Sequence, residues 1–145
     1  MRKKIISVVC FLLAVFVSHG IAADSAPFFF LQLSDPQFGF MDNNKSISAE
    51  TEAMNKAVTA INQLKPPFVV ITGDFVNNSK SKEQIAAYKS MIAQIDSSVK
   101  VYMIPGNHDI GKVSRASIDN YKKNYGEPHF SFRYGDCAFI GIDSN

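Results

Sequence analysis

Residues 99–109, Val-Lys-Val-Tyr-Met-Ile-Pro-Gly-Asn-His-Asp, decide the fold. The apolar part, Val99 to Ile104, is typical of a buried strand, and Pro-Gly closes it. Two earlier stretches have the same form: Phe68 to Ile71 leads into Thr-Gly-Asp, and Phe28 to Leu33 leads into Ser-Asp-Pro. The sequence therefore predicts three buried strands, each opening into a polar loop at its carboxyl end.

Helical patterns separate these strands. Ser48 is expected to cap a helix whose apolar residues recur with near-3.6 spacing as far as Leu64, before Pro66-Pro67 stop it. Ser81 and Gln84 predict a capping box at the start of the next helix. Three strand–loop–helix units in succession predict an α/β layer fold with parallel strands.

The last part of the chain has a different pattern. A shorter helix around Tyr121 is expected to end at Gly126. Two strands, 130–134 and 138–142, then flank a Gly-Asp turn, as in a hairpin. Cys137 opens the apolar run 137–142, so we expect a buried, inert thiol there.

The N-terminal segment is typical of an export signal. A basic start, Arg2-Lys3-Lys4, precedes the apolar run Ile5 to Val17 and then small residues up to Ala23. The alternatives are a membrane anchor, for which the run is too short, and a lipoprotein site at Cys10, whose preceding Val9 is too large. We expect a signal peptide over residues 1–23, a domain over 24–145, and a periplasmic or secreted protein with no membrane span after signal removal.

Composition excludes several classes of protein. The 145 residues carry a formal charge of +2, too small for a general nucleic-acid binder. A hydrophobic fraction of 46% excludes intrinsic disorder. Two cysteines cannot make a disulfide scaffold or a thiolate zinc site.

Polar residues of the kinds that bind metal ions follow each predicted strand. Ligands in an open α/β sheet bind beyond the carboxyl ends of the strands. Those positions carry Asp35-Pro36-Gln37, Gly73-Asp74 and Gly106-Asn107-His108-Asp109, whose oxygen and nitrogen donors suit divalent metals. Any one of these short elements alone is more typical of a turn. The ordered set at three successive strand ends predicts a site.

The set resembles the calcineurin-like metallophosphoesterases, whose pattern is Asp-x-His, Gly-Asp and Gly-Asn-His-Asp/Glu, each after a strand. The resemblance runs from about Phe28 to the end of the chain, and Asp-Pro-Gln-Phe-Gly at the first motif is similar to the branch of calcineurin-like phosphoesterase domain-containing protein 1. It implies a four-layer αββα sandwich, of which this chain would be the N-terminal half.

The resemblance also implies hydrolysis of a phosphoester by two divalent metal ions, with Mn, Fe, Zn and Mg all open. Asp74 matches the carboxylate that bridges the ions, Asp35 a ligand of the first ion, and Asn107 a ligand of the second. His108 matches the family's non-ligand histidine, which acts on the phosphate or the leaving oxygen. Asp109 is expected to orient its imidazole.

Two departures from the family pattern leave a second reading open. Gln37 stands where the family usually has a metal-binding His, and the family's later His ligands have no counterpart here. His129 matches no ligand position and is expected to be structural. The chain is thus expected to be an inactive N-terminal fragment of a phosphatase or phosphodiesterase, or else a non-catalytic binding domain with an incomplete metal site. The sequence leaves open the substrate and the oligomeric state.

Overall fold

The structure is a computed structural model, and it describes residues 26–145. The predicted signal peptide, residues 1–23, lies outside the described residues. Strands β1 (Leu31–Ser34), β2 (Phe68–Thr72) and β3 (Lys100–Ile104) form one parallel sheet in the order β1-β2-β3. A second sheet is the antiparallel hairpin of β4 (Phe130–Tyr134) and β5 (Cys137–Gly141). The predicted parallel α/β arrangement and the hairpin are therefore confirmed.

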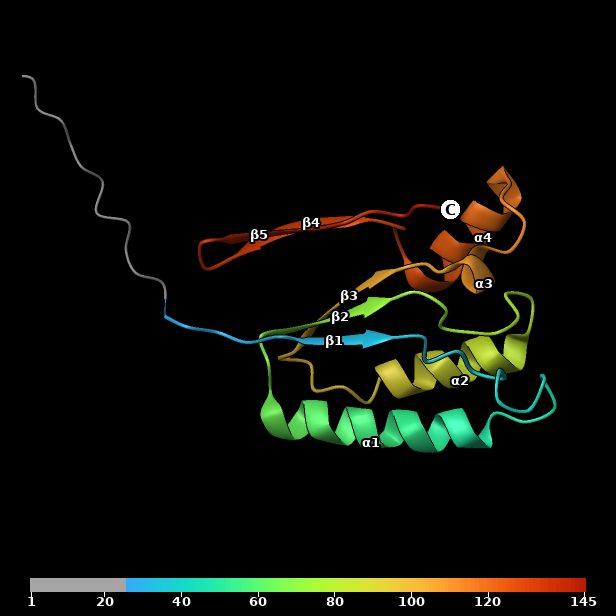
Figure 1. The fold of residues 1–145 in the computed structure, drawn as a ribbon, viewed down its shortest axis with the longest axis horizontal. Coiled ribbons are helices and arrows are strands. Elements are labelled where there is room, and N and C mark those ends of the chain that lie inside the picture. Colours follow the sequence, from blue (N-terminus) through green and yellow to red (C-terminus); the bar gives the residue numbers. More distant parts are fainter. Residues whose placement is uncertain (1–25) are drawn as a thin grey trace, which may run out of the picture.

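The helices connect and cover the parallel sheet. Helix α1 (Ser48–Leu64) links β1 to β2, and α2 (Lys82–Ile92) links β2 to β3. Figure 1 shows both helices on one face of the sheet and the hairpin on the other. The short α3 (Asn107–Ile110) and α4 (Arg115–Tyr125) follow β3 and lie near the carboxyl ends of the strands. The described residues thus form successive helix, sheet and hairpin layers.

Both faces of the central strand are buried. Val69 and Ile71 belong to the core shared with the helices. On the other face, the Phe68 ring packs edge-on against Phe139 of the hairpin at 4.9 Å between centroids. Tyr102 of β3 stacks on Phe132 of β4 at 3.8 Å. Because apolar side chains cover both faces, β2 has the continuous hydrophobic sequence expected of a parallel strand.

The edge strands differ from the prediction. β1 begins at Leu31, so the apolar run from Phe28 is longer than the strand, and Phe29 and Phe30 are exposed. Along β1 half-buried and exposed residues alternate, because β1 lies at the edge of the sheet and only one of its faces is well covered. The prediction that all three strands are buried holds only for β2.

Three local predictions are also corrected. Ser48 is the first residue of α1 and does not cap it; Ile47 occupies the cap position without a side-chain hydrogen bond. Ser81 does cap α2, accepting from the Gln84 N–H at 3.3 Å, but the Gln84 side chain bonds elsewhere. Cys137 is exposed rather than buried, because it directly follows the turn at the closed end of the hairpin.

Among the described residues no helix is both long and apolar enough to cross a membrane.

Candidate active site

The loops that leave the three parallel strands are fastened to one another by backbone hydrogen bonds. Asp35 donates to the Gly73 carbonyl at 3.2 Å, and Gln37 donates to the Asp74 carbonyl at 2.8 Å. Gly73 in turn donates to the carbonyl of Ile104 at 2.9 Å. The structure therefore brings the three sequence-predicted motifs together at one edge of the sheet.

Asp74 lies where the second and third loops meet. It is a non-glycine residue with a φ of 44° and is largely buried. Its Oδ1 accepts the backbone N–H of His108 at 2.8 Å. A methyl group at Gly106 would overlap Asp74 Oδ1, so only glycine fits beside this carboxylate. A left-handed backbone at a buried carboxylate is the kind of strain that clusters at functional sites.

Asp109 is also buried, and its partners are not those predicted. Its Oδ1 accepts the backbone N–H groups of Phe75 and Val76 at 2.8 and 3.2 Å, and its Oδ2 accepts that of Gly106 at 2.9 Å. The prediction that Asp109 orients the His108 imidazole is wrong, because these three bonds direct the carboxylate to the backbone. Asp109 instead ties the loop after β2 to the loop after β3.

The ionisation of Asp109 reflects its burial. Desolvation raises the pKa of this carboxyl to about 7, while the three N–H donors act in the opposite direction and Asp74 raises it further. Burial is therefore the main reason why Asp109 holds its proton to a higher pH than a solvated carboxyl does.

His108 is oriented by a group that no sequence pattern indicates. Its Nδ1 lies 2.9 Å from the backbone carbonyl oxygen of Asn77. Since a carbonyl only accepts, Nδ1 must carry a proton, and Nε2 is left as the second nitrogen available for chemistry. The sequence could not reveal this partner, because any residue at position 77 supplies the same carbonyl.

Gln37 is held by a chain of side-chain amides. Its Nε2 donates to Asn77 Oδ1 at 3.4 Å, and Asn77 Nδ2 donates to Asn44 Oδ1 at 2.9 Å. Asn44 Oδ1 also accepts from Gln84 Nε2 at 2.8 Å, and Gln84 is 3% exposed. Because the amide nitrogen of Gln37 is engaged, its oxygen remains as an acceptor. Sequence reasoning missed this network, since it joins the loop after β1 to the loop after β2 and to the first turn of α2, which are about 40 residues away in the sequence.

The remaining candidate ligands are accessible. Asp35 and Asn107 are both exposed, Asp35 with a φ of 54° and Asn107 as the first residue of α3. A hydroxyl donor, Ser34 Oγ, contacts the Asp35 carboxylate. Within residues 26–145, no three His, Cys, Asp or Glu side chains converge as a metal-binding group. The candidate donors are two carboxylates and two amides, whose oxygens are of the kind that hard cations prefer but are too few to complete a site for two ions.

Residues 30–143 match the calcineurin-like phosphoesterase family. The chain belongs to this family, as the fold and the three loops at the carboxyl edge predict. The resemblance seen in the sequence motifs is therefore confirmed.

The curated relatives include the predicted branch. The chain is 34% identical to serine/threonine-protein phosphatase CPPED1 of Bos taurus, over 81% of this chain and 43% of that protein. It is 30% identical to the CPPED1 of Homo sapiens, over 91% of this chain and 47% of the relative. A probable glycerophosphodiester phosphodiesterase GpdQ of Arcobacter nitrofigilis is 31% identical over 65% of this chain and 35% of its own length. The chain thus spans less than half the length of these relatives.

A solved structure is also similar. A dimetal phosphatase from Danio rerio superimposes with a TM-score of 0.49 and 20% identity, over 70% of this chain and 35% of that structure.

Proposed function

We propose that this chain supplies the N-terminal part of a two-metal phosphoesterase site, and that a further segment of the protein completes it. The observation that carries the proposal is the Asp74 carboxylate, which is strained, buried and fixed by the His108 N–H where two strand-end loops meet. The length of the curated relatives, of which the chain covers 43–47%, supports the need for a further segment. We propose that the activity of the complete protein is of the same class as that of these relatives, which are named as phosphatases.

The residues of this chain have distinct proposed roles. Asp74 would be shared between two divalent ions, with Asp35 and the Gln37 oxygen on one side and Asn107 on the other. When bound, such ions neutralise phosphoryl oxygens and lower the pKa of water. His108 holds its Nδ1 proton against the Asn77 carbonyl and presents Nε2 to the phosphoryl group or its leaving oxygen. Asp109 fixes the loops that carry Asp74 and His108.

A second candidate function rests on the ligand set. Two carboxylates and two amides hold at most one hard cation, and imidazole ligands are absent from the described part of the chain's site. A non-catalytic domain that keeps the fold and binds a phosphorylated group would need no more than this. A Gly-His-x-His motif in the reading frame beyond Asn145 favours the enzyme, and its absence favours the binding domain.

We also propose that the protein is exported, as a periplasmic or secreted enzyme. The basic, apolar and small-residue layout of residues 1–23 supports this. N-terminal sequencing of the protein secreted by its host should give a first residue directly after Ala22 or Ala23. An intact Met1 terminus in the secreted or periplasmic fraction would contradict it.

The site proposal is tested by two substitutions that should both lower activity but should differ in their effect on metal content. In the complete protein, Asp74→Asn should abolish hydrolysis of a chromogenic phosphate ester in Mn²⁺ and lower the metal content, because an amide cannot offset the repulsion between two cations. His108→Ala should lower kcat by about 10²–10⁴-fold with near-normal metal content. Asp119→Asn, an exposed carboxylate on α4, is the control. Full metal loading and activity in Asp74→Asn would refute the assignment.

A further inference from the structure

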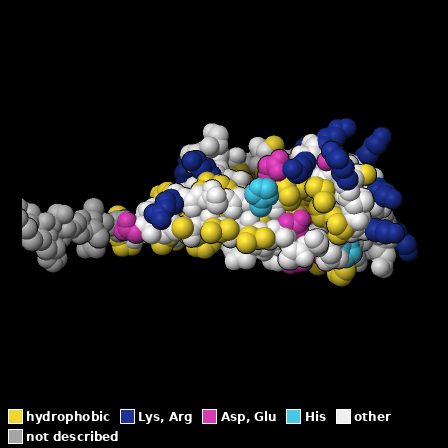
Figure 2. Space-filling view, turned by 90° about the horizontal axis from the view of Figure 1, so that it is seen from above, with side chains coloured by type: hydrophobic (Ala, Val, Ile, Leu, Met, Phe, Trp, Pro, Cys, Tyr) yellow, Lys and Arg dark blue, Asp and Glu magenta, His cyan; other side chains and the backbone are white. Residues whose placement is uncertain are grey.

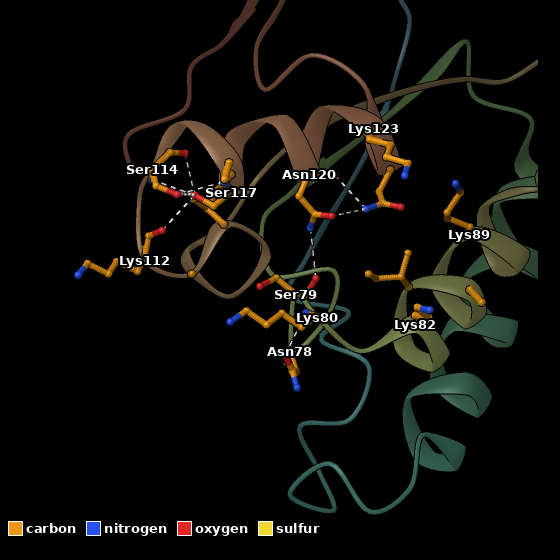
Figure 3. A pocket seen from close by; sticks show the side chains of 16 residues that line it. Asn78, Ser79, Lys80, Lys82, Lys89, Lys112, Ser114, Ser117, Asn120 and Lys123 are labelled. Carbon is orange, nitrogen blue, oxygen red and sulfur yellow. Dashed lines mark hydrogen bonds between the residues drawn. The ribbon is translucent and has the colours of Figure 1, made fainter.

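A groove of about 1140 Å³ lies beside the candidate site, and five lysines line it. Helix α2 forms one wall and α4 the other, with the segments after β2 and α3 between them (Figure 3). The Asn120 side chain on α4 donates to the carbonyl of Ser79, in the loop between β2 and α2, at 3.4 Å. This bond joins α4 to the segment that leads into the opposite wall. The lysines of the groove are Lys80, Lys82, Lys89, Lys112 and Lys123.

The positive charge of this groove is not neutralised. No Asp or Glu lines it. The lysines that form ion pairs within residues 26–145 are Lys56, Lys65 and Lys122, and none of them lines the groove. All five groove lysines are exposed. Figure 2 shows Lys and Arg side chains gathered at the same end of the molecule as α3 and α4. Such a one-sign surface attracts an anionic partner.

The lining also indicates which kind of anion fits. The volume is above the range of about 300–1000 Å³ that is usual for small-molecule pockets. No aromatic side chain lines it, so bases of a single-stranded nucleic acid would find no stacking platform. Between the lysines lie short polar and apolar side chains, Ser117, Asn124, Ile85 and Ala86. An extended acidic peptide matches both the charge and this mixed floor.

The groove and the candidate active site share two segments of the chain. Asn78 lines the groove and directly follows Asn77, whose carbonyl holds His108. Ile110 also lines the groove and ends α3, which begins with Asn107. We propose that the groove binds an acidic segment of a phosphorylated protein substrate, next to the phosphorylated residue that enters the site. This inference rests on the proposed phosphoesterase function and names its substrate class.

The test measures binding, which does not require hydrolysis. The probe is a fluorescein-labelled peptide of Glu and Ser with one phosphoserine, followed by fluorescence anisotropy at low ionic strength. Lys89→Glu with Lys123→Glu should weaken the Kd at least about tenfold, because the charge reversal turns two attractive contacts into repulsive ones. Binding of the unchanged protein should also fall steeply at about 0.5 M salt.

A matched variant controls for net charge. Lys100→Glu with Arg133→Glu makes the same change in charge at exposed positions outside the groove and should leave the Kd unchanged. Circular dichroism checks the fold of each variant, and Lys82→Gln with Lys112→Gln provides a milder second test. An equal loss in the matched control, or tighter binding of a single-stranded DNA probe than of the peptide, overturns the inference. If the protein shows no phosphoesterase activity but still binds the peptide in a way that depends on the groove lysines, the proposed function is overturned and the binding groove is not.

Discussion

Replacing Asp109 by alanine should destabilise the fold through the backbone rather than through the catalytic chemistry. Asp109 is 1% exposed, and its two oxygens accept three backbone N–H groups. Two of the donors, Phe75 and Val76, are themselves fully buried. Alanine offers no acceptor, so all three N–H groups lose their partner at once.

The magnitude follows from those three groups. A buried donor left without a partner costs about 1–3 kcal/mol. Three such donors give a loss of at least about 3 kcal/mol, against a total stability of about 5–15 kcal/mol for a domain. The cavity left by the side chain adds to this loss, whereas water entering it would satisfy part of the donors.

Urea unfolding followed by circular dichroism checks the value, with Asp119→Ala as the exposed control on α4. Amide hydrogen exchange provides a local measurement, and the N–H groups of Phe75, Val76 and Gly106 should lose protection first. A loss of less than about 1 kcal/mol with unchanged exchange at these amides would refute the tying role of Asp109.

Three further predictions concern the same edge of the sheet. Because the pKa of Asp109 is raised from 3.8 to about 7, the metal-free folded chain keeps a proton that the unfolded chain releases. Its stability should therefore fall as pH rises through that window, by at most about 1.4 kcal/mol per pH unit, and urea midpoints at successive pH values should show a flatter profile for Asp109→Asn. Gly106→Ala should displace the Asp74 carboxylate and lower Mn²⁺ binding by calorimetry, whereas unchanged binding would show that the loop adapts. Gln37→His should tighten Zn²⁺ or Mn²⁺ binding, because imidazole replaces an amide oxygen, and no gain would mean that Gln37 faces away from the ion.

Much of the fold could be predicted because two sequence patterns indicate the same three strands: the runs of apolar residues and the polar motifs that directly follow them. Val69 and Ile71 in a continuous apolar run indicated a doubly covered strand, and the structure places it at the centre of the parallel sheet. The three polar motifs share one edge because parallel strands all end there. The edge position of β1, in contrast, depends on the order of the strands in the sheet. That order is set by contacts between residues far apart in the sequence, which local patterns do not reveal.

The contacts inside the site were harder to predict. Asp109 was expected to orient the His108 imidazole. In α3 their side chains diverge, and the carboxylate turns to the backbone of the preceding loop while the imidazole meets the Asn77 carbonyl. Backbone acceptors and donors are the same for every residue type, so composition and spacing do not reveal them.

The amide network gives a physical reason why Gln37 is compatible with a metal site. An amide ligand is useful only if its oxygen, and not its nitrogen, faces the ion. Asn77 Oδ1 accepts from Gln37 Nε2, and Asn44 in turn accepts from both Asn77 and the buried Gln84. The backbone N–H of Asn78 donates to Gln84 Oε1 at 2.8 Å, so the other end of the Gln84 amide is the donor to Asn44, and each later bond in the chain takes its direction from this one. The Gln37 oxygen is thereby preorganised as a hard donor, so we expect the site to prefer Mg²⁺ or Mn²⁺ to Zn²⁺.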